Sequence, residues 1–143
     1  MTASRRWDSP DQIRQLATKY TAAWCSQDAG SVAAFFAERG SLRINDGSPH
    51  VGRAAITEAA QGFMSAFPDM VVTMDDLSVD RSHAVYRWTL TGTNDGPGGT
   101  GRAVRIRGYE EWTIGEDSLI AESRGHFDED DYRRQLADGV GGG

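Results

Sequence analysis

Residues 104–114 alternate between apolar and polar side chains, and one carboxylate interrupts the apolar series. Successive side chains of a β-strand point to opposite faces of its sheet, so this pattern predicts a strand with one buried face. The buried face carries Val104, Ile106, Gly108, Glu110, Trp112 and Ile114, and the other face carries Arg105, Arg107, Tyr109, Glu111 and Thr113. Glu110 is therefore expected to be an acid on an apolar wall.

Glu110 has two interpretations. Removal of a carboxyl from water disfavours its charged form, which raises the pKa and suits the group to proton transfer. Alternatively, Glu110 is paired with an arginine, or it lies at a solvated end of the strand. Ion pairs that serve only structure also place acids in such positions.

Length and charge limit the classes of function. The 143 residues are enough for one domain, and a net charge of −6 with 15 basic residues argues against a nucleic-acid partner. The single cysteine cannot form an internal disulfide, which suits a reducing compartment. No apolar run is long enough to span a membrane, and the first seven residues lack the apolar stretch of a signal peptide. We expect a soluble, cytoplasmic protein without a membrane partner.

The first half of the chain has helical periodicity. Ser9 and Pro10 begin a predicted helix whose apolar face carries Ile13, Leu16, Tyr20 and Trp24. A second, shorter helix is expected after Asp28, with Val32, Phe35 and Phe36 on its apolar face and Gly40 at its end. After a short extended piece over 42–45, a third helix is predicted over 53–67 and ends at Pro68.

The second half alternates with a period of two. Strands are predicted over 70–79, 83–92, 104–114 and 119–127, and the glycine-rich segment 95–101 is expected to be a mobile lid. Three helices followed by an antiparallel meander indicate an α+β fold, with the helices on one face of a curved sheet. We divide the chain into a flexible arm over 1–8, a domain over 9–138 and a glycine tail over 139–143.

Short motifs along residues 10–138 have a familiar order and spacing. They are Tyr20 with Ala23, Trp24 and Asp28; residues 36–40; Gly52 to Ile56; Phe67-Pro68-Asp69; Thr91-Gly92-Thr93; Thr100-Gly101-Arg102; His126-Phe127-Asp128; and Arg134-Gln135-Leu136. Together they resemble the SnoaL-like, polyketide cyclase-like branch of the nuclear transport factor 2-like superfamily.

The resemblance implies a cystatin-like, cone-shaped α+β barrel around a deep pocket, and a homodimer formed through the outer face of the sheet. It also implies a catalytic acid on the last strand and a histidine on the preceding strand, as in the cyclases. These positions fall on Gly125 and near Trp112 here, and a polar pocket position falls on Glu110. The chain thus lacks the usual pair, which leaves Glu110 as the best-placed interior acid.

Other candidate residues have both functional and structural interpretations. His126 and Asp128 could act as a base and an acid at the pocket rim, or Asp128 could cap a short helix over 129–136. A substrate-binding wall is predicted from Tyr20, Trp24, Phe63, Trp88 and Trp112, although aromatic residues at such spacings also form cores. Asn45 could orient a ligand carbonyl, or it could be a turn residue.

The hypothesis that follows is a cofactor-free enzyme that carries out isomerase- or lyase-like proton transfer on a hydrophobic, carbonyl-bearing ring compound. Glu110 would be the acid/base, and Tyr20 would donate a hydrogen bond to a developing enolate oxygen. The alternative is a dimeric protein that binds a hydrophobic metabolite without turnover. No metal is expected, because His50, His83 and His126 lie apart without the short spacings of metal ligands.

Overall fold

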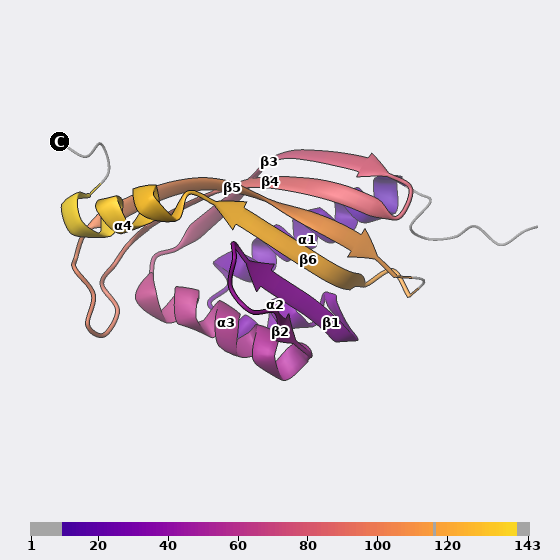
Figure 1. Ribbon diagram of the computed structural model, residues 1–143, viewed down its shortest axis with the longest axis horizontal. Helices are drawn as coiled ribbons and strands as arrows, with labels where there is room; N and C mark the ends of the chain where they lie inside the picture. The colour runs from indigo at the N-terminus through magenta and orange to yellow at the C-terminus, as the bar shows by residue number, and fades with distance from the viewer. Residues whose placement is uncertain (1–9, 116, 140–143) are drawn as a thin grey trace, which may run out of the picture.

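The computed structural model describes residues 10–115 and 117–139 (Figure 1). The elements follow in the order α1 (Pro10–Cys25), α2 (Ala29–Ala33), β1 (Phe36–Ile44), β2 (His50–Val51), α3 (Arg53–Ala66), β3 (Val71–Asp80), β4 (His83–Thr93), β5 (Ala103–Ile114), β6 (Ile120–Phe127) and α4 (Glu129–Asp138). The arm expected over 1–8 and residues 140–143 of the expected tail lie outside the described residues.

The strands form one curved, open sheet in the order β2-β1-β6-β5-β4-β3. β3 to β6 are the predicted antiparallel meander, whereas β1 pairs with β6 in parallel. The expected α+β architecture, with helices on a mainly antiparallel sheet, is confirmed. Within the part of the chain described, no helix is long and apolar enough to cross a membrane.

The helices cover the concave side of the sheet and enclose the core. α1 contacts β3 and α2, while α3 contacts α2, β1 and β2. In Figure 1, α1 crosses behind the strands and α3 runs beside β1. The apolar positions predicted for α1 and α3 provide buried residues of the core, including Ile13, Tyr20, Ile56 and Met64.

The second predicted helix is wrong beyond Ala33. Phe36 and Gly40 belong to β1 instead, and the Asp28 side chain makes no cap hydrogen bond to α2. The reason is the pairing with β6, which shifts register between Phe36 and Ser41. A Cβ atom at Gly40 would lie 2.8 Å from the carbonyl oxygen of Ile120, so the glycine allows a close backbone approach rather than ending a helix.

The last strand begins one residue later than predicted. A register shift between Thr113 and Ile114 pairs Ile114 with Ile120, and Ile120 is buried in place of Leu119. From Ser123 onward the predicted alternation is confirmed, because Ser123 and Gly125 are buried while Arg124 is exposed. The bulge therefore leaves the inward-facing centre of β6 as the sequence pattern predicts it.

The glycine-rich loop between β4 and β5 is organised by Asn94. The Asn94 side chain donates to the carbonyl oxygen of Ala66 at the end of α3 and accepts from the backbone N–H of Thr100. Gly96 also donates to the Ala66 carbonyl oxygen, and a Cβ atom at Gly96 would overlap the backbone of Ser65. The loop is thus held against α3, and none of its residues lines the interior cavity described below.

α4 completes the sheet beyond the end of β6. β6 ends opposite Gly108, and the buried Gln135 of α4 then takes the place of a strand partner for β5. Its side chain accepts from the backbone N–H of Arg105 at 2.6 Å and donates to the Arg105 carbonyl oxygen at 3.0 Å. The side-chain amide of Gln135 therefore satisfies both the N–H and the carbonyl of Arg105, which lies beyond the end of β6.

We predict that Gln135→Ala lowers the free energy of unfolding by about 1–3 kcal/mol, because it removes both hydrogen bonds to Arg105. Urea unfolding followed by circular dichroism measures the change. Arg133→Ala, on the exposed side of the same helix, is the control and should change stability by less than about 0.5 kcal/mol. Equal stabilities of the two variants would contradict a role for Gln135 in holding α4.

Candidate active site

Glu110 lies at the centre of the inner face of the sheet, as its alternation predicts. The register places it between Tyr86 on β4 and Gly125 on β6. Its side chain is buried, with 7% of the residue exposed. No arginine pairs with it among the described residues, so the alternative of a structural ion pair does not apply.

Three donors from three elements converge on one oxygen of this carboxyl. The Tyr20 hydroxyl of α1, the Trp112 indole N–H of β5 and the Ser123 hydroxyl of β6 donate to Oε1 over 2.9, 2.9 and 2.7 Å. No described residue donates to Oε2. The protein thus fixes one oxygen of Glu110 and leaves the other for a bound molecule.

Burial sets the protonation behaviour of the site. It raises the pKa of Glu110 above the ordinary value of a glutamate, and the hydrogen bonds from Trp112, Ser123 and Tyr20 oppose that rise only in part. The pKa of Tyr20 is also raised, first by burial and then by the neighbouring Glu110 charge. Tyr20 therefore remains a neutral hydrogen-bond donor.

An apolar cavity of about 70 Å³ lies in front of Glu110. Its lining comes from the inner face of the sheet and from α1, α3 and α4. The lining residues are Trp24, Leu42, Ile44, Phe63, Phe67, Val72, Tyr86, Trp88, Leu90, Ile106, Glu110, Gly125, Phe127 and Tyr132. Glu110 is the one carboxyl among them, and they include no arginine, lysine or histidine, so proton transfer near neutral pH in this cavity depends on Glu110.

The predicted aromatic wall divides into two groups. Trp24, Phe63 and Trp88 line the cavity, whereas Tyr20 and Trp112 lie behind the carboxyl and hold it. The Tyr20 ring makes edge-on or tilted contacts with five aromatic rings, which fixes its position. The Tyr20 hydroxyl is therefore occupied by Glu110 rather than directed at a substrate oxygen.

The structure does not bring Asn45, His126 and Asp128 to Glu110. They line a separate polar groove of about 510 Å³, together with Asp46, Arg107, Gly108, Tyr109, Phe127 and Glu129. His126 lies on the outer face of the sheet, where its Nε2 is 2.8 Å from Glu111 Oε1. Phe127 borders both the groove and the cavity.

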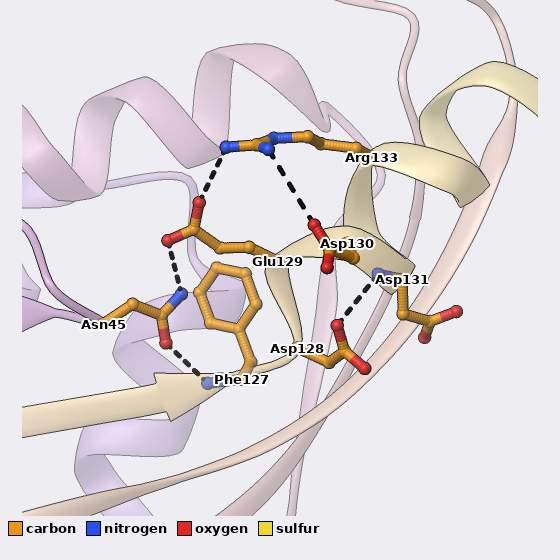
Figure 2. Close-up of polar contacts among 7 residues, drawn as sticks. All are labelled: Asn45, Phe127, Asp128, Glu129, Asp130, Asp131 and Arg133. Atoms are coloured by element: carbon orange, nitrogen blue, oxygen red, sulfur yellow. Dashed lines mark hydrogen bonds and ion pairs between the residues drawn. The ribbon is translucent and has the colours of Figure 1, made fainter.

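Asn45 and Asp128 both serve the start of α4 (Figure 2). The Asn45 side chain accepts from the backbone N–H of Phe127 at 2.9 Å and donates to the Glu129 carboxylate at 3.2 Å. Asp128 caps α4 by accepting from the backbone N–H of Asp131, as the helix-cap interpretation expects. These contacts position Phe127 and Tyr132 at the end of the cavity.

Several residues of the site were not among the candidates named from the sequence. Ser123, which donates to Glu110, follows from the alternation of β6, since it lies on the inward side of that strand. Ile106 and Leu90 likewise follow from period two. Tyr132 carries no comparable signal, because its place depends on how α4 folds back over β5. Among the described residues, no cluster of three or more His, Cys, Asp or Glu side chains offers a metal site.

The chain thus forms a curved sheet closed by helices around an apolar cavity that contains one carboxyl. The sequence profile of the SnoaL-like domain matches residues 17–123, and the chain belongs to this family. No curated protein sequence gives a significant match.

Solved structures with the same fold include TsrD from Streptomyces laurentii, at 25% identity and a TM-score of 0.78, with 90% of this chain and 96% of that chain covered. A candidate SnoaL-like polyketide cyclase from Jannaschia sp. CCS1 has 18% identity and a TM-score of 0.73, over 95% and 98% of the two chains. SalBIII, an epoxide hydrolase/cyclase-like enzyme of pyran ring formation in the polyether salinomycin, has 16% identity and a TM-score of 0.75, over 87% and 96%.

We predict that Glu110 makes stability depend on pH. As pH rises above the ordinary glutamate pKa near 4.5, the unfolded chain loses this proton before the folded protein does. The contribution of Glu110 to the free energy of unfolding is therefore largest at low pH. It falls as pH rises, and the fall ends once pH exceeds the raised pKa of Glu110 in the folded state. Glu110→Gln should remove this fall, so its stability relative to the wild type should rise from pH 4 to pH 8.

Urea unfolding at several pH values measures this difference. Glu122→Gln, on the exposed side of β6, is the matched control and should follow the wild-type profile. A stability difference between Glu110→Gln and the wild type that does not change with pH would contradict the raised pKa.

Proposed function

We propose that this protein is a small-molecule enzyme that moves a proton on a hydrophobic, carbonyl-bearing ring compound, with Glu110 as the acid/base. The observation that carries the proposal is the carboxyl itself. It is buried beside an apolar cavity, its Oε1 is held by three donors, and its Oε2 has none among the described residues. The cyclase-type description of structural relatives is consistent with this chemistry.

The proposed reaction requires only this chain's own groups. Ionised Glu110 takes a proton from the carbon next to the carbonyl group, and the electron pair of that C–H bond moves into an enolate. The neutral acid then returns the proton to another carbon of the conjugated system, which completes an isomerisation. The donors on Oε1 stabilise the carboxylate and keep its orientation, while the apolar walls exclude water.

A raised pKa supports this role because it makes ionised Glu110 a stronger base than an exposed glutamate, and because both protonation states become accessible closer to neutral pH. His126 and Asp128 have no part in the proposal, since they lie at the outer groove.

The alternative function is binding of a hydrophobic metabolite without turnover. It is favoured by Gly125, which stands where the family resemblance places a catalytic acid and contributes only backbone to the cavity. A single acid in an apolar cavity can also serve as one hydrogen-bonding anchor for a ligand.

We predict that the protein accelerates exchange of the α-protons of cyclohexanone in D₂O, measured by proton NMR, and that Glu110→Gln slows this exchange by about a hundredfold or more. Glu111→Gln changes the next residue, whose side chain is on the opposite face, and should keep the wild-type rate. Binding of cyclohexanone without accelerated exchange by the wild type would favour the binding function.

We further propose that the outer face of the sheet forms a homodimer. This face carries Arg105, Arg107, Tyr109 and Glu111, and Tyr109 stacks on His126 with 4.7 Å between ring centroids. Arg87 lies over the same tyrosine ring, 5.5 Å from its centroid. Positive, aromatic and negative groups on one surface can pair with a second copy of themselves.

The double substitution of Arg107 and Tyr109 by Asp should convert the protein to a monomer in light scattering, because it places like charges opposite one another in such a dimer. The double substitution Asp75→Asn with Asp76→Asn, at the far edge of the sheet, is the control and should remain dimeric. A wild-type protein that is monomeric at high micromolar concentration would contradict this proposal.

A further inference from the structure

Gly125 is a glycine that neither the backbone conformation nor the packing of β6 requires. Its φ angle is not positive, so other residues can adopt the same conformation. A Cβ atom at this position would meet two atoms of the described residues beyond its chain neighbours. They are the Arg43 carbonyl oxygen at 3.4 Å and Glu110 Cγ at 3.7 Å, both at ordinary van der Waals distances. Because a glycine inside a strand weakens that strand, the strand itself does not explain this one.

The other three glycines within the described strands are different. A Cβ atom at Gly40, Gly92 or Gly108 would lie 2.8, 3.1 or 2.5 Å from its nearest protein atom. At each of these positions the protein fills the space that the glycine leaves. At Gly125 this space belongs to the apolar cavity, because the glycine is part of the lining. A glycine inside a strand often marks a place where a ligand approaches the backbone closely.

The space over Gly125, between Ile44 and Glu110, is called the Gly125 notch below. The register places Gly125 between Ile44 of β1 and Glu110 of β5, and all three residues line the cavity. Neighbouring strands lie about 4.8 Å apart, so the two flanking strands are separated by roughly 9–10 Å. Once the flanking side chains are in place, the notch has room for a methylene group or for the edge of a ring.

The Gly125 notch lies directly against the proposed acid/base. A ligand carbon at the position of the added Cβ atom would be 3.7 Å from Glu110 Cγ, which is van der Waals contact. The carboxyl group begins one bond beyond Cγ, so the ring carbons bonded to that ligand carbon come within its reach. Tyr20, Trp112 and Ser123 all donate to Oε1, which leaves Oε2 to meet these carbons.

The groups around the notch exclude an anionic ligand. Without an arginine, lysine or histidine in the lining, an anion would face the Glu110 carboxyl with no compensating charge. The hydroxyls of the lining belong to Tyr86 and Tyr132. Burial raises the pKa of both tyrosines above its ordinary value, so both stay neutral. The Tyr86 hydroxyl is also hydrogen-bonded to the hydroxyl of Thr21.

We infer that Gly125 determines which ring the cavity accepts, and that one methylene of an uncharged cyclic ketone occupies the Gly125 notch beside Glu110. The inference rests on the proposed function and narrows its substrate class. The fitting compounds have an unsubstituted ring CH₂ that can enter between Ile44 and Glu110. A ring whose carbons carry large substituents at that place does not fit.

The test uses cyclopentanone and cyclohexanone, two cyclic ketones that differ by one methylene. Their dissociation constants are measured by NMR titration for the wild type and for Gly125→Ala, which adds one methyl group in the notch. We expect Gly125→Ala to weaken cyclohexanone binding about tenfold more than cyclopentanone binding, because the methyl group takes the space of one methylene. Gly62→Ala, on the exposed side of α3 where a Cβ atom meets nothing, is the matched control and should leave the ratio of the two constants unchanged.

A second measurement uses only the wild-type protein. Nuclear Overhauser effects are expected between the ring protons of bound cyclohexanone and the α-protons of Gly125. Their absence in a complex that shows such effects to Trp24, or an unchanged ratio of dissociation constants in a folded Gly125→Ala, would overturn the role of Gly125. The proposed function would then still stand if the wild type exchanges the α-protons of cyclohexanone.

The opposite result separates the two proposals in the other direction. The expected change of the ratio, without proton exchange by the wild type, would support the role of Gly125 in binding and overturn the proposed reaction. Failure of both ketones to bind to the wild type would overturn both.

Discussion

The hydrogen bond from Tyr20 to Glu110 connects the first helix to the middle of the sheet, and the rest of the site depends on it. A carboxyl in an apolar interior is destabilising unless donors surround it. Here the donors come from α1, β5 and β6, so the acid is tolerated only when all three elements are in place. The free-energy cost of burying the Glu110 carboxyl thereby fixes the positions of α1, β5 and β6 relative to one another.

Of the two glycines beside this acid, only Gly125 leaves its space to the cavity. Gly108 precedes Glu110 on the same face of β5, and Gly125 pairs with it on β6. The space over Gly108 is filled by the Trp88 ring, while Gly125 remains part of the cavity lining. Large aromatic side chains packed beside residues without side chains leave a gap of defined shape, and the converging rings around Tyr20 keep it from collapsing.

Period-two alternation made the inner face of the sheet predictable from sequence, because each side chain of a strand points to one of only two faces. The residues predicted in this way include Glu110, Trp112 and Ser123. The same reasoning could not find β1, since its partner β6 lies about eighty residues further along the chain and its aromatic pair fits a helix equally well. The local pattern also could not predict the hydrogen-bond partner of the Tyr20 hydroxyl or of the Trp112 indole N–H. Both were expected to meet a ligand, and both bind the acid instead.

The contacts of Asn45 and His126 likewise could not be predicted from the sequence, because they depend on residues that only the folded chain brings near. Asn45 reaches Phe127 and Glu129, which are distant in sequence, and His126 turns outward to Glu111. Only the folded sheet brings such partners together. The motif-based expectation for Asp128 was divided between a rim acid and a helix cap, and the cap contact is present because α4 begins immediately after β6.

The Gln135 contact has a consequence for how the molecule behaves among its own copies. Beyond Gly108, β5 has no strand on its β6 side, and its inward residues there are the apolar Val104 and Ile106. An unpaired strand edge of this kind is a template on which another chain can add, and edge-to-edge addition is the usual beginning of aggregation. The Gln135 side chain occupies the N–H and the carbonyl of Arg105, so these two groups are not free to pair with a strand of another chain.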